Sequence, residues 1–377
     1  MNAPSLNKSI KFSENMRSAH ELILMAKNGK KGNKLVEGYA LPAFNVTTYD
    51  GIQAACEAFD ILGSSGILAF SNSALKHFGH GDALQGLEAI HGLVKFRASK
   101  SSVQIATHLD HGDNIGEHGR KVIRGAIEMF TSVMADNSTD HANKRATSLK
   151  VNMEATREVV ELAHPKGVSV EGELGVLAGV EDEDTHSEIS TYTDPVELKE
   201  FLENTGVLLL APTIGTMHGP NKGKPGDKVK LNVELAHECL KLANKINDEI
   251  IFVAHGASTL YPQVVDYAIE NLSALGLKDE VNTWKNFVGT DWEQIKGLIG
   301  AGFCKINTDT ENRQTYLAAL IGALNKSGSK VDIRFYEKIT YRALVDSYVQ
   351  KLIMAGNYGV WHEPKINVNE FKFDLNL

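Results

Sequence analysis

Residues 103–112 read VQIATHLDHG, an apolar and β-branched run that ends in two histidines and an aspartate. The run predicts a strand over Val103–His111. Alternate side chains of a strand share a face, so His111 points away from the face that His108 and Asp110 share. A histidine beside an acid at a strand end is typical either of a metal ligand next to an acid/base group or of an ordinary polar loop edge. Equivalent positions elsewhere in the chain decide between these two interpretations.

Seven further apolar runs predict strands, and stretches with helical periodicity separate them. The runs are Tyr39–Val46, Gly66–Asn72, Thr131–Asp136, Val168–Leu174, Val207–Ile214, Ile250–His255 and Phe303–Thr308. The clearest helix candidates are Asp50–Leu62, Asn152–Ala163, Pro195–Asn204 and Val233–Asn247. This alternation predicts an α/β fold, a parallel (β/α)8 TIM barrel. The alternative is a doubly wound open sheet, but residues 46–51 after the first strand lack its glycine-rich dinucleotide fingerprint.

Three segments extend this minimal barrel. A lead-in helix is expected over Ser18–Lys27, and a C-terminal helix over Tyr341–Met354. The long connection Thr259–Gly302 is interpreted as a helical insertion after the seventh strand, because loops of such length usually carry structure of their own. Its helix-like segments are Tyr261–Leu275 and Trp292–Ile299. The expected organisation is one domain over residues 1–377, with a barrel core at about 39–325 and the insertion at about 259–288.

Composition excludes several classes of protein. The chain of 377 residues is 42% hydrophobic and 23% charged, which is typical of a soluble globular protein. The net charge of −8 gives no reason to expect binding to nucleic acid or to an anionic membrane. No apolar run approaches the roughly 20 residues that span a bilayer. Three widely spaced cysteines argue against a disulfide framework and favour a cytoplasmic location.

Active sites of barrels form at the C-terminal ends of the strands, so the polar residues at these ends are the candidates. Three histidines, His111, His218 and His255, follow the third, sixth and seventh strands. Three imidazoles with an open fourth position are typical of a catalytic zinc site. The segments 218–219 and 255–258 place glycine after histidine, which lets backbone N–H groups approach an anion and favours a phosphorylated substrate. Ordinary turns and helix caps are the competing interpretation of these segments.

With these residues in place, the chain resembles the class II, metal-dependent fructose-1,6-bisphosphate aldolases and their tagatose-bisphosphate relatives. The motifs that carry the resemblance occur in the family's order over roughly residues 39–312. They are Pro42–Asn45, His108–Gly112, Thr131–Asp136, Val170–Gly175, Gly215–Gly219 with Lys222-Gly223, His255–Ser258 and Lys305–Thr310.

The resemblance implies a zinc-dependent aldolase that reversibly cleaves fructose-1,6-bisphosphate to dihydroxyacetone phosphate and glyceraldehyde 3-phosphate through a metal-stabilised enediolate. It implies that His111, His218 and His255 bind the catalytic Zn²⁺. Asp110 resembles the residue that exchanges a proton with the aldehyde oxygen. Glu181 resembles the mobile glutamate that handles the proton on the enolisable carbon.

The remaining matched positions concern a second cation, the substrate and the assembly. Asp136 and Glu173 match positions that hold a second metal, divalent or monovalent, in some members. A homodimer or homotetramer acting in glycolysis is implied. The implied substrate and phosphate contacts are Asn45, Ser71, Gly219, Lys222, Gly256, Ser258, Asn307 and Thr308.

Some positions depart from the family's pattern, mainly on the phosphate-binding side. Ala257 replaces a glycine, residues 220–221 read Pro-Asn, and a C-terminal Asp-Pro-Arg signature is missing. The Lys305–Asp309 motif is short, so either Asn307 or Lys305 could occupy the family's asparagine position. Two alternatives therefore stay open: an aldolase for another ketose phosphate, such as tagatose-1,6-bisphosphate or a monophosphate, and a non-catalytic aldolase-like subunit.

Overall fold

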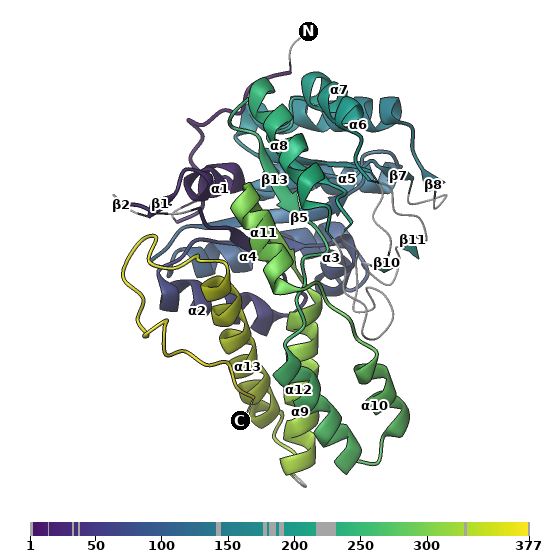
Figure 1. Cartoon of the computed structure of the whole chain (residues 1–377). Coiled ribbons are helices and arrows are strands. Elements are labelled where there is room, and N and C mark those ends of the chain that lie inside the picture. The colour runs from purple at the N-terminus through teal and green to yellow at the C-terminus, as the bar shows by residue number, and fades with distance from the viewer. Residues whose placement is uncertain are drawn as a thin grey trace.

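The computed structural model of the protein shows a closed parallel barrel (Figure 1). It describes residues 3–13, 15–31, 34–36, 38–140, 145–175, 179–180, 186–187, 192–215, 231–327 and 330–375. Within these ranges eight strands close in the order β12-β13-β14-β3-β4-β5-β6-β9. They are β3 (Leu41–Asn45), β4 (Gly66–Phe70), β5 (Ile105–Gly112), β6 (Ser132–Ala135), β9 (Ser169–Leu174), β12 (Leu209–Pro212), β13 (Ile251–Ala254) and β14 (Phe303–Thr308). The predicted TIM barrel is therefore confirmed, and each strand lies within the predicted run or one residue beyond it.

Helices surround the barrel or extend from it. They are α2 (Tyr49–Leu62), α3 (Asn72–Phe78), α4 (Ala83–Ala98), α5 (Glu117–Met129), α6 (Leu149–Ala163), α7 (Pro195–Thr205), α8 (Val233–Ile246), α11 (Trp292–Ala301), α12 (Thr310–Ser327) and α13 (Ile333–Met354). Small antiparallel pairs join β1 (Lys30–Lys31) with β2 (Lys34–Leu35), β7 (Thr139–Asp140) with β8 (Arg145–Ala146), and β10 (Gly179–Val180) with β11 (His186–Ser187). No helix in the described ranges combines the length and apolar character needed to cross a bilayer.

The connection after β13 forms more helix than the sequence predicted. It contains α9 (Pro262–Ala274) and α11 as expected, and also α10 (Lys278–Lys285), which was not predicted. Only two apolar residues of α10, Val281 and Trp284, are buried, so its own sequence gives a weak helical pattern. With α9, α12 and α13 this helix forms a projection below the barrel in Figure 1, and Val281 and Trp284 belong to its apolar core.

The C-terminal helix is also longer than predicted. It begins at Ile333 rather than at Tyr341, and Asp332 caps it by accepting from the N–H of Arg334. Ile333 is 65% exposed, so the first turns of α13 carry little of the buried apolar periodicity by which a helix is recognised from its sequence.

The lead-in helix α1 (Ala19–Lys27) closes the N-terminal end of the barrel. Leu22 and Ile23 are fully buried among the first inward-facing residues of the strands, such as Leu41 and Ile251. His20 is also buried, and its Nε2 lies 2.9 Å from the carbonyl oxygen of Glu249. The apolar base of the barrel is therefore filled, and polar side chains that need access to a ligand can lie only toward the other end.

We expect His20 to make the fold sensitive to acid. Burial lowers the pKa of His20 to about 4, and its hydrogen bond to Glu249 opposes this shift only in part. The unfolded chain binds a proton below about pH 6.5 while the folded chain does not, so stability falls as the pH drops from 6.5 toward 4. Between pH 7 and 5 this histidine should account for a loss of about 2 kcal/mol in the free energy of unfolding.

Urea unfolding at both pH values tests this expectation. His20→Gln should lose less stability than the wild type between pH 7 and 5, by about the amount assigned to His20. The same substitution at exposed His118 controls for the loss of an imidazole as such. An unchanged pH dependence in His20→Gln would contradict the assignment.

Candidate active site

The carboxyl end of β5 leaves regular strand geometry at His111. This residue has a φ of +48°, and the pairing of β5 with β6 shifts register between Leu109 and Gly112. Asp110 faces the inside of the barrel by strand alternation. The left-handed backbone at His111 turns the His111 side chain inward as well. The side chains of Asp110 and His111, which regular strand alternation would place on opposite faces, can therefore belong to one site. His108 is fully buried, and its Nδ1 lies 2.9 Å from Ser132 Oγ.

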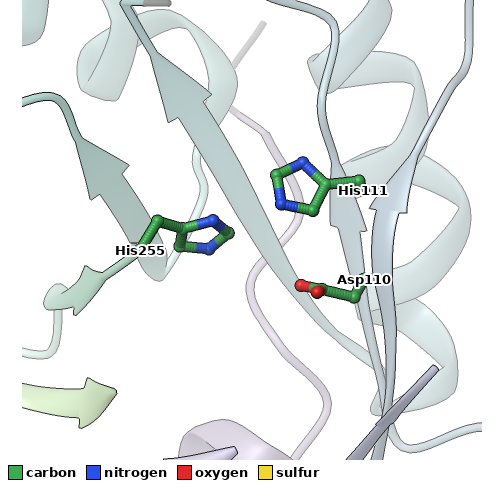
Figure 2. A group of neighbouring side chains, drawn as sticks. All are labelled: Asp110, His111 and His255. Atoms are coloured by element: carbon green, nitrogen blue, oxygen red, sulfur yellow. The ribbon is translucent and has the colours of Figure 1, made fainter. Parts of the chain in front are cut away.

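Asp110, His111 and His255 form one group of side chains. Figure 2 shows the two rings and the carboxylate pointing toward one another from β5 and from the end of β13. One ligand atom of each lies within 4.8 Å of the others, and the ring centroids of the two histidines are 4.9 Å apart. Asp110 is 1% exposed and His255 is 2% exposed, so the group is nearly shielded from bulk water.

Two asparagines hold the Asp110 carboxylate. Asn45 Nδ2 donates to Asp110 Oδ2 at 2.7 Å, and Asn307 Nδ2 donates to Asp110 Oδ1 at 3.1 Å. Asn307 Nδ2 also lies 3.1 Å from His255 Nε2. The ends of β3, β5, β13 and β14 therefore meet at this carboxylate, although they are far apart in the sequence.

A second group shares His111. Its Nδ1 lies 2.8 Å from Asp136 Oδ2 and 3.8 Å from Glu173 Oε2, and ligand atoms of the three residues lie within 4.8 Å of one another. Ser138 Oγ donates to the other oxygen of Asp136 at 2.7 Å. The two residues predicted for a second cation therefore lie next to the first group.

The hydrogen bonds of the two rings fix their tautomers. Asp136 Oδ2 accepts from His111 Nδ1 at 2.8 Å, and Glu171 Oε1 accepts from His255 Nε2 at 2.9 Å. A carboxylate can only accept, so these nitrogens carry the protons and the lone pairs lie on His111 Nε2 and His255 Nδ1. Histidines that bind metals usually donate their other ring N–H in this way.

Electrostatics keep the group in the form that could bind a cation. Burial, followed by the charge of His111, lowers the pKa of His255 well below its ordinary value, so the ring is neutral near pH 7. Burial alone would raise the pKa of Asp110, but His111, His255, Lys305 and the Asn45 hydrogen bond together lower it. Imidazole nitrogens beside a carboxylate are a nitrogen and oxygen donor set that suits Zn²⁺ and similar divalent metals. The described donors therefore fit a divalent metal.

A layer of charged side chains that was not predicted from the sequence lies directly below this group. Lys305 Nζ lies 2.7 Å from Glu171 Oε2 and 3.3 Å from His108 Nε2, and all three side chains are fully buried. Lys305 was one of two candidates for the asparagine position, but it is Asn307 that reaches Asp110. The alternation of side chains along a strand was the available signal. Glu171 lies two residues before Glu173, and Lys305 two residues before Asn307, so each pair shares the inward face of its strand.

Other predicted contact residues lie around the group with hydrogen bonds to the backbone. Ser71 Oγ accepts from Ala74 N at the start of α3. Ser258 Oγ accepts from the N–H groups of Asp309 and Thr310 at the start of α12, at 3.1 and 3.3 Å. The hydroxyl group of Thr308, another predicted contact residue, donates to Ala43 O. Gly256, also predicted to contact the substrate, has a φ of +62°. Glu181, His218, Gly219 and Lys222 lie outside the described residues.

Comparisons with known proteins agree with this geometry. The profile of the family "Fructose-bisphosphate aldolase class-II" matches residues 33–359. A fructose-bisphosphate aldolase of Thermus caldophilus is 33% identical over 324 residues, which cover 86% of this chain and 95% of that protein. One from Helicobacter pylori is 31% identical over 334 residues, covering 87% and 98%.

A solved structure shows the same fold. The fructose-bisphosphate aldolase of Campylobacter jejuni superposes with a TM-score of 0.67 at 20% identity, over 93% of this chain and 98% of that one. Since the family profile covers most of the chain and the relatives exceed 30% identity, the chain belongs to the class-II fructose-bisphosphate aldolase family and is an aldolase, a carbon–carbon lyase.

Proposed function

We propose that the protein is a zinc-dependent aldolase that reversibly cleaves fructose-1,6-bisphosphate to dihydroxyacetone phosphate and glyceraldehyde 3-phosphate. The observation that carries the proposal is the convergence of Asp110, His111 and His255 within 4.8 Å at the carboxyl ends of β5 and β13. The relatives named above are fructose-bisphosphate aldolases, which supports this choice of substrate.

Asp110 is proposed to move the proton of the hydroxyl group that becomes the aldehyde. Cleavage of the ketose needs a base at this oxygen, and the return reaction needs the same group as an acid. The lowered pKa of Asp110 keeps it ionised near neutral pH, so it can accept the proton. Asn45 and Asn307 hold its two oxygens in place, which orients the carboxylate before the substrate binds.

His111 Nε2 and His255 Nδ1 are proposed to hold the catalytic metal, and His218 to complete the set. A bound Zn²⁺ would act as a Lewis acid for the enediolate that bond cleavage leaves. Asp136 and Glu173, adjacent to His111, are proposed to hold a second cation or to orient the first. Glu181 is proposed to return the proton to the enediolate carbon.

A phosphate group is proposed to bind near the start of α12. The backbone N–H groups of Asp309 and Thr310 lie at this end of an 18-residue helix, where the helix dipole favours an anion. They now donate to Ser258 Oγ, so the hydroxyl and these donors lie together. Gly256 allows close approach of a ligand to the backbone before Ser258.

We further propose that the whole chain acts as one aldolase domain, as a homodimer or homotetramer of the cytoplasm. The packing of α9 and α10 against α12 supports one unit, because the insertion shares an apolar core with a helix that follows the last barrel strand. Cys56, Cys239 and Cys304 are buried and unpaired, which fits a reducing compartment.

A substrate panel with metal analysis tests the proposal. The purified protein should contain Zn²⁺ and should prefer fructose-1,6-bisphosphate over tagatose-1,6-bisphosphate and ketose monophosphates by more than about 100-fold in kcat/KM, or about 2.7 kcal/mol in transition-state binding. Preference for another ketose phosphate would retain the aldolase chemistry and overturn the proposed substrate. Cleavage at full rate without bound metal would overturn the mechanism.

A further inference from the structure

Two fully buried ion pairs in this chain have the same separation between their charged groups but different surroundings. Lys305 and Glu171 lie 2.7 Å apart inside the barrel, and Lys351 and Glu311 lie 2.7 Å apart between α13 and α12. All four side chains are 0% exposed. A buried pair has a large desolvation cost and is weak evidence for stability, so a pair beside a functional site calls for another explanation.

Glu171 connects its ion pair to the candidate active site. Its Oε2 accepts from Lys305 Nζ at 2.7 Å, and its Oε1 accepts from His255 Nε2 at 2.9 Å. The ammonium group of Lys305 balances the negative charge of the Glu171 carboxylate. A carboxylate has no N–H or O–H group, so Glu171 can only accept hydrogen bonds. His255 Nε2 therefore donates to Glu171, and Nδ1 carries the lone pair. The Asn307 amide, whose nitrogen lies 3.1 Å from the same Nε2, then donates to Asp110 Oδ1 and not to His255.

Lys305 is itself held from a second side. Its Nζ lies 3.3 Å from His108 Nε2, and His108 Nδ1 lies 2.9 Å from Ser132 Oγ. An ammonium group can only donate, so His108 Nε2 accepts from Lys305 and His108 Nδ1 donates to Ser132. Side chains from β5, β6, β9 and β14 thus fix the oxygen that faces His255.

We infer that Glu171 and Lys305 are positioning residues that select the tautomer and ring orientation of His255, so that Nδ1 is presented to a metal ion. The inference rests on the proposed function in one respect, namely that His255 binds the metal. It gives a function to the buried charged side chains of Glu171 and Lys305, which lie beneath the proposed metal ligands and are not themselves proposed as ligands. It also explains why His255 Nδ1 rather than Nε2 should be the ligand atom.

A matched pair of double variants isolates the acceptor without leaving a buried charge unmatched. Glu171→Leu/Lys305→Met removes both charges and the acceptor for His255 Nε2. Glu171→Gln/Lys305→Met also removes both charges but keeps an amide oxygen that can accept from that nitrogen. Glu311→Leu/Lys351→Met removes the other buried pair and serves as the control for general loss of stability.

The main readout is the dissociation constant for Zn²⁺, measured on each full-length protein by competition with a chromophoric chelator. Glu171→Leu/Lys305→Met should bind Zn²⁺ about 10- to 100-fold more weakly than the wild type. Glu171→Gln/Lys305→Met should recover most of this loss, and Glu311→Leu/Lys351→Met should bind as the wild type does. The visible absorption of bound Co²⁺ should change only in the variant that lacks the acceptor.

The possible results separate the inference from the proposed function. Equal Zn²⁺ affinity in the leucine and glutamine variants would overturn the positioning role while leaving the metal site intact. A wild-type protein that binds no Zn²⁺ would overturn the proposed function itself. Thermal unfolding of all variants shows whether each is folded, and the glutamine variant provides the rescue that a merely structural role would not give.

Discussion

Removal of the metal should abolish aldol cleavage, and added Zn²⁺ should restore it. His111 belongs to both groups of candidate ligands, so His111→Ala should have the largest effect of any single substitution at the metal site. Loss of a Lewis acid worth several kcal/mol corresponds to at least about a 10³-fold decrease in kcat. Cleavage rate and metal content are measured together, before and after chelation and for the variant.

The control for this prediction is His237→Ala, since His237 is exposed on α8. It should retain both zinc and activity. Treatment with borohydride in the presence of substrate should leave the enzyme active, because Lys305 is fully buried and ion-paired with Glu171 rather than available for a Schiff base. Undiminished cleavage by metal-free protein, or inactivation by borohydride, would contradict the metal-dependent mechanism.

The strands were predictable because they are buried on both faces. A parallel barrel strand such as Phe303–Thr308 is entirely buried, so its sequence is a compact run that stands out from the polar segments around it. Element bounds were less predictable where tertiary contacts decide them. Helix α10 and the first turns of α13 have too few buried apolar residues to show helical periodicity, and packing in the projection below the barrel stabilises α10.

The site was predictable where a motif joins residues that are close in sequence, and less so where the fold joins distant ones. Asp110 and His111 are adjacent, and their need for a bent strand end follows from side-chain alternation. The contact of Glu171 with both Lys305 and His255 joins β9, β14 and β13, and only the register of the closed barrel brings these residues together. A sequence shows such charges as polar residues inside strands, without showing their partners.

Asp110→Asn should lower kcat by about 10²- to 10⁴-fold while zinc remains bound. The substitution removes the group that accepts a proton, and it leaves His111 and His255 in place. It also replaces one oxygen of the carboxylate with an NH₂ group, which cannot accept a hydrogen bond. Asn45 and Asn307 each donate to one of the two oxygens, so one of these hydrogen bonds is lost. Part of the loss is therefore lost orientation, and Asn45→Ala, which keeps the carboxylate, should show the smaller effect of disturbed orientation alone.

The pH dependence provides the second half of the test. The pKa of Asp110 lies below its ordinary value of about 3.9, because the neighbouring histidines, Lys305 and Asn45 outweigh the effect of burial. The carboxylate therefore persists as the pH falls, and its protonation should not reduce kcat between pH 8 and 5. Asp110→Asn should accordingly lose activity by a constant factor across this range. A loss confined to one end of the range, or a kcat near the wild-type value, would show that another group moves the proton.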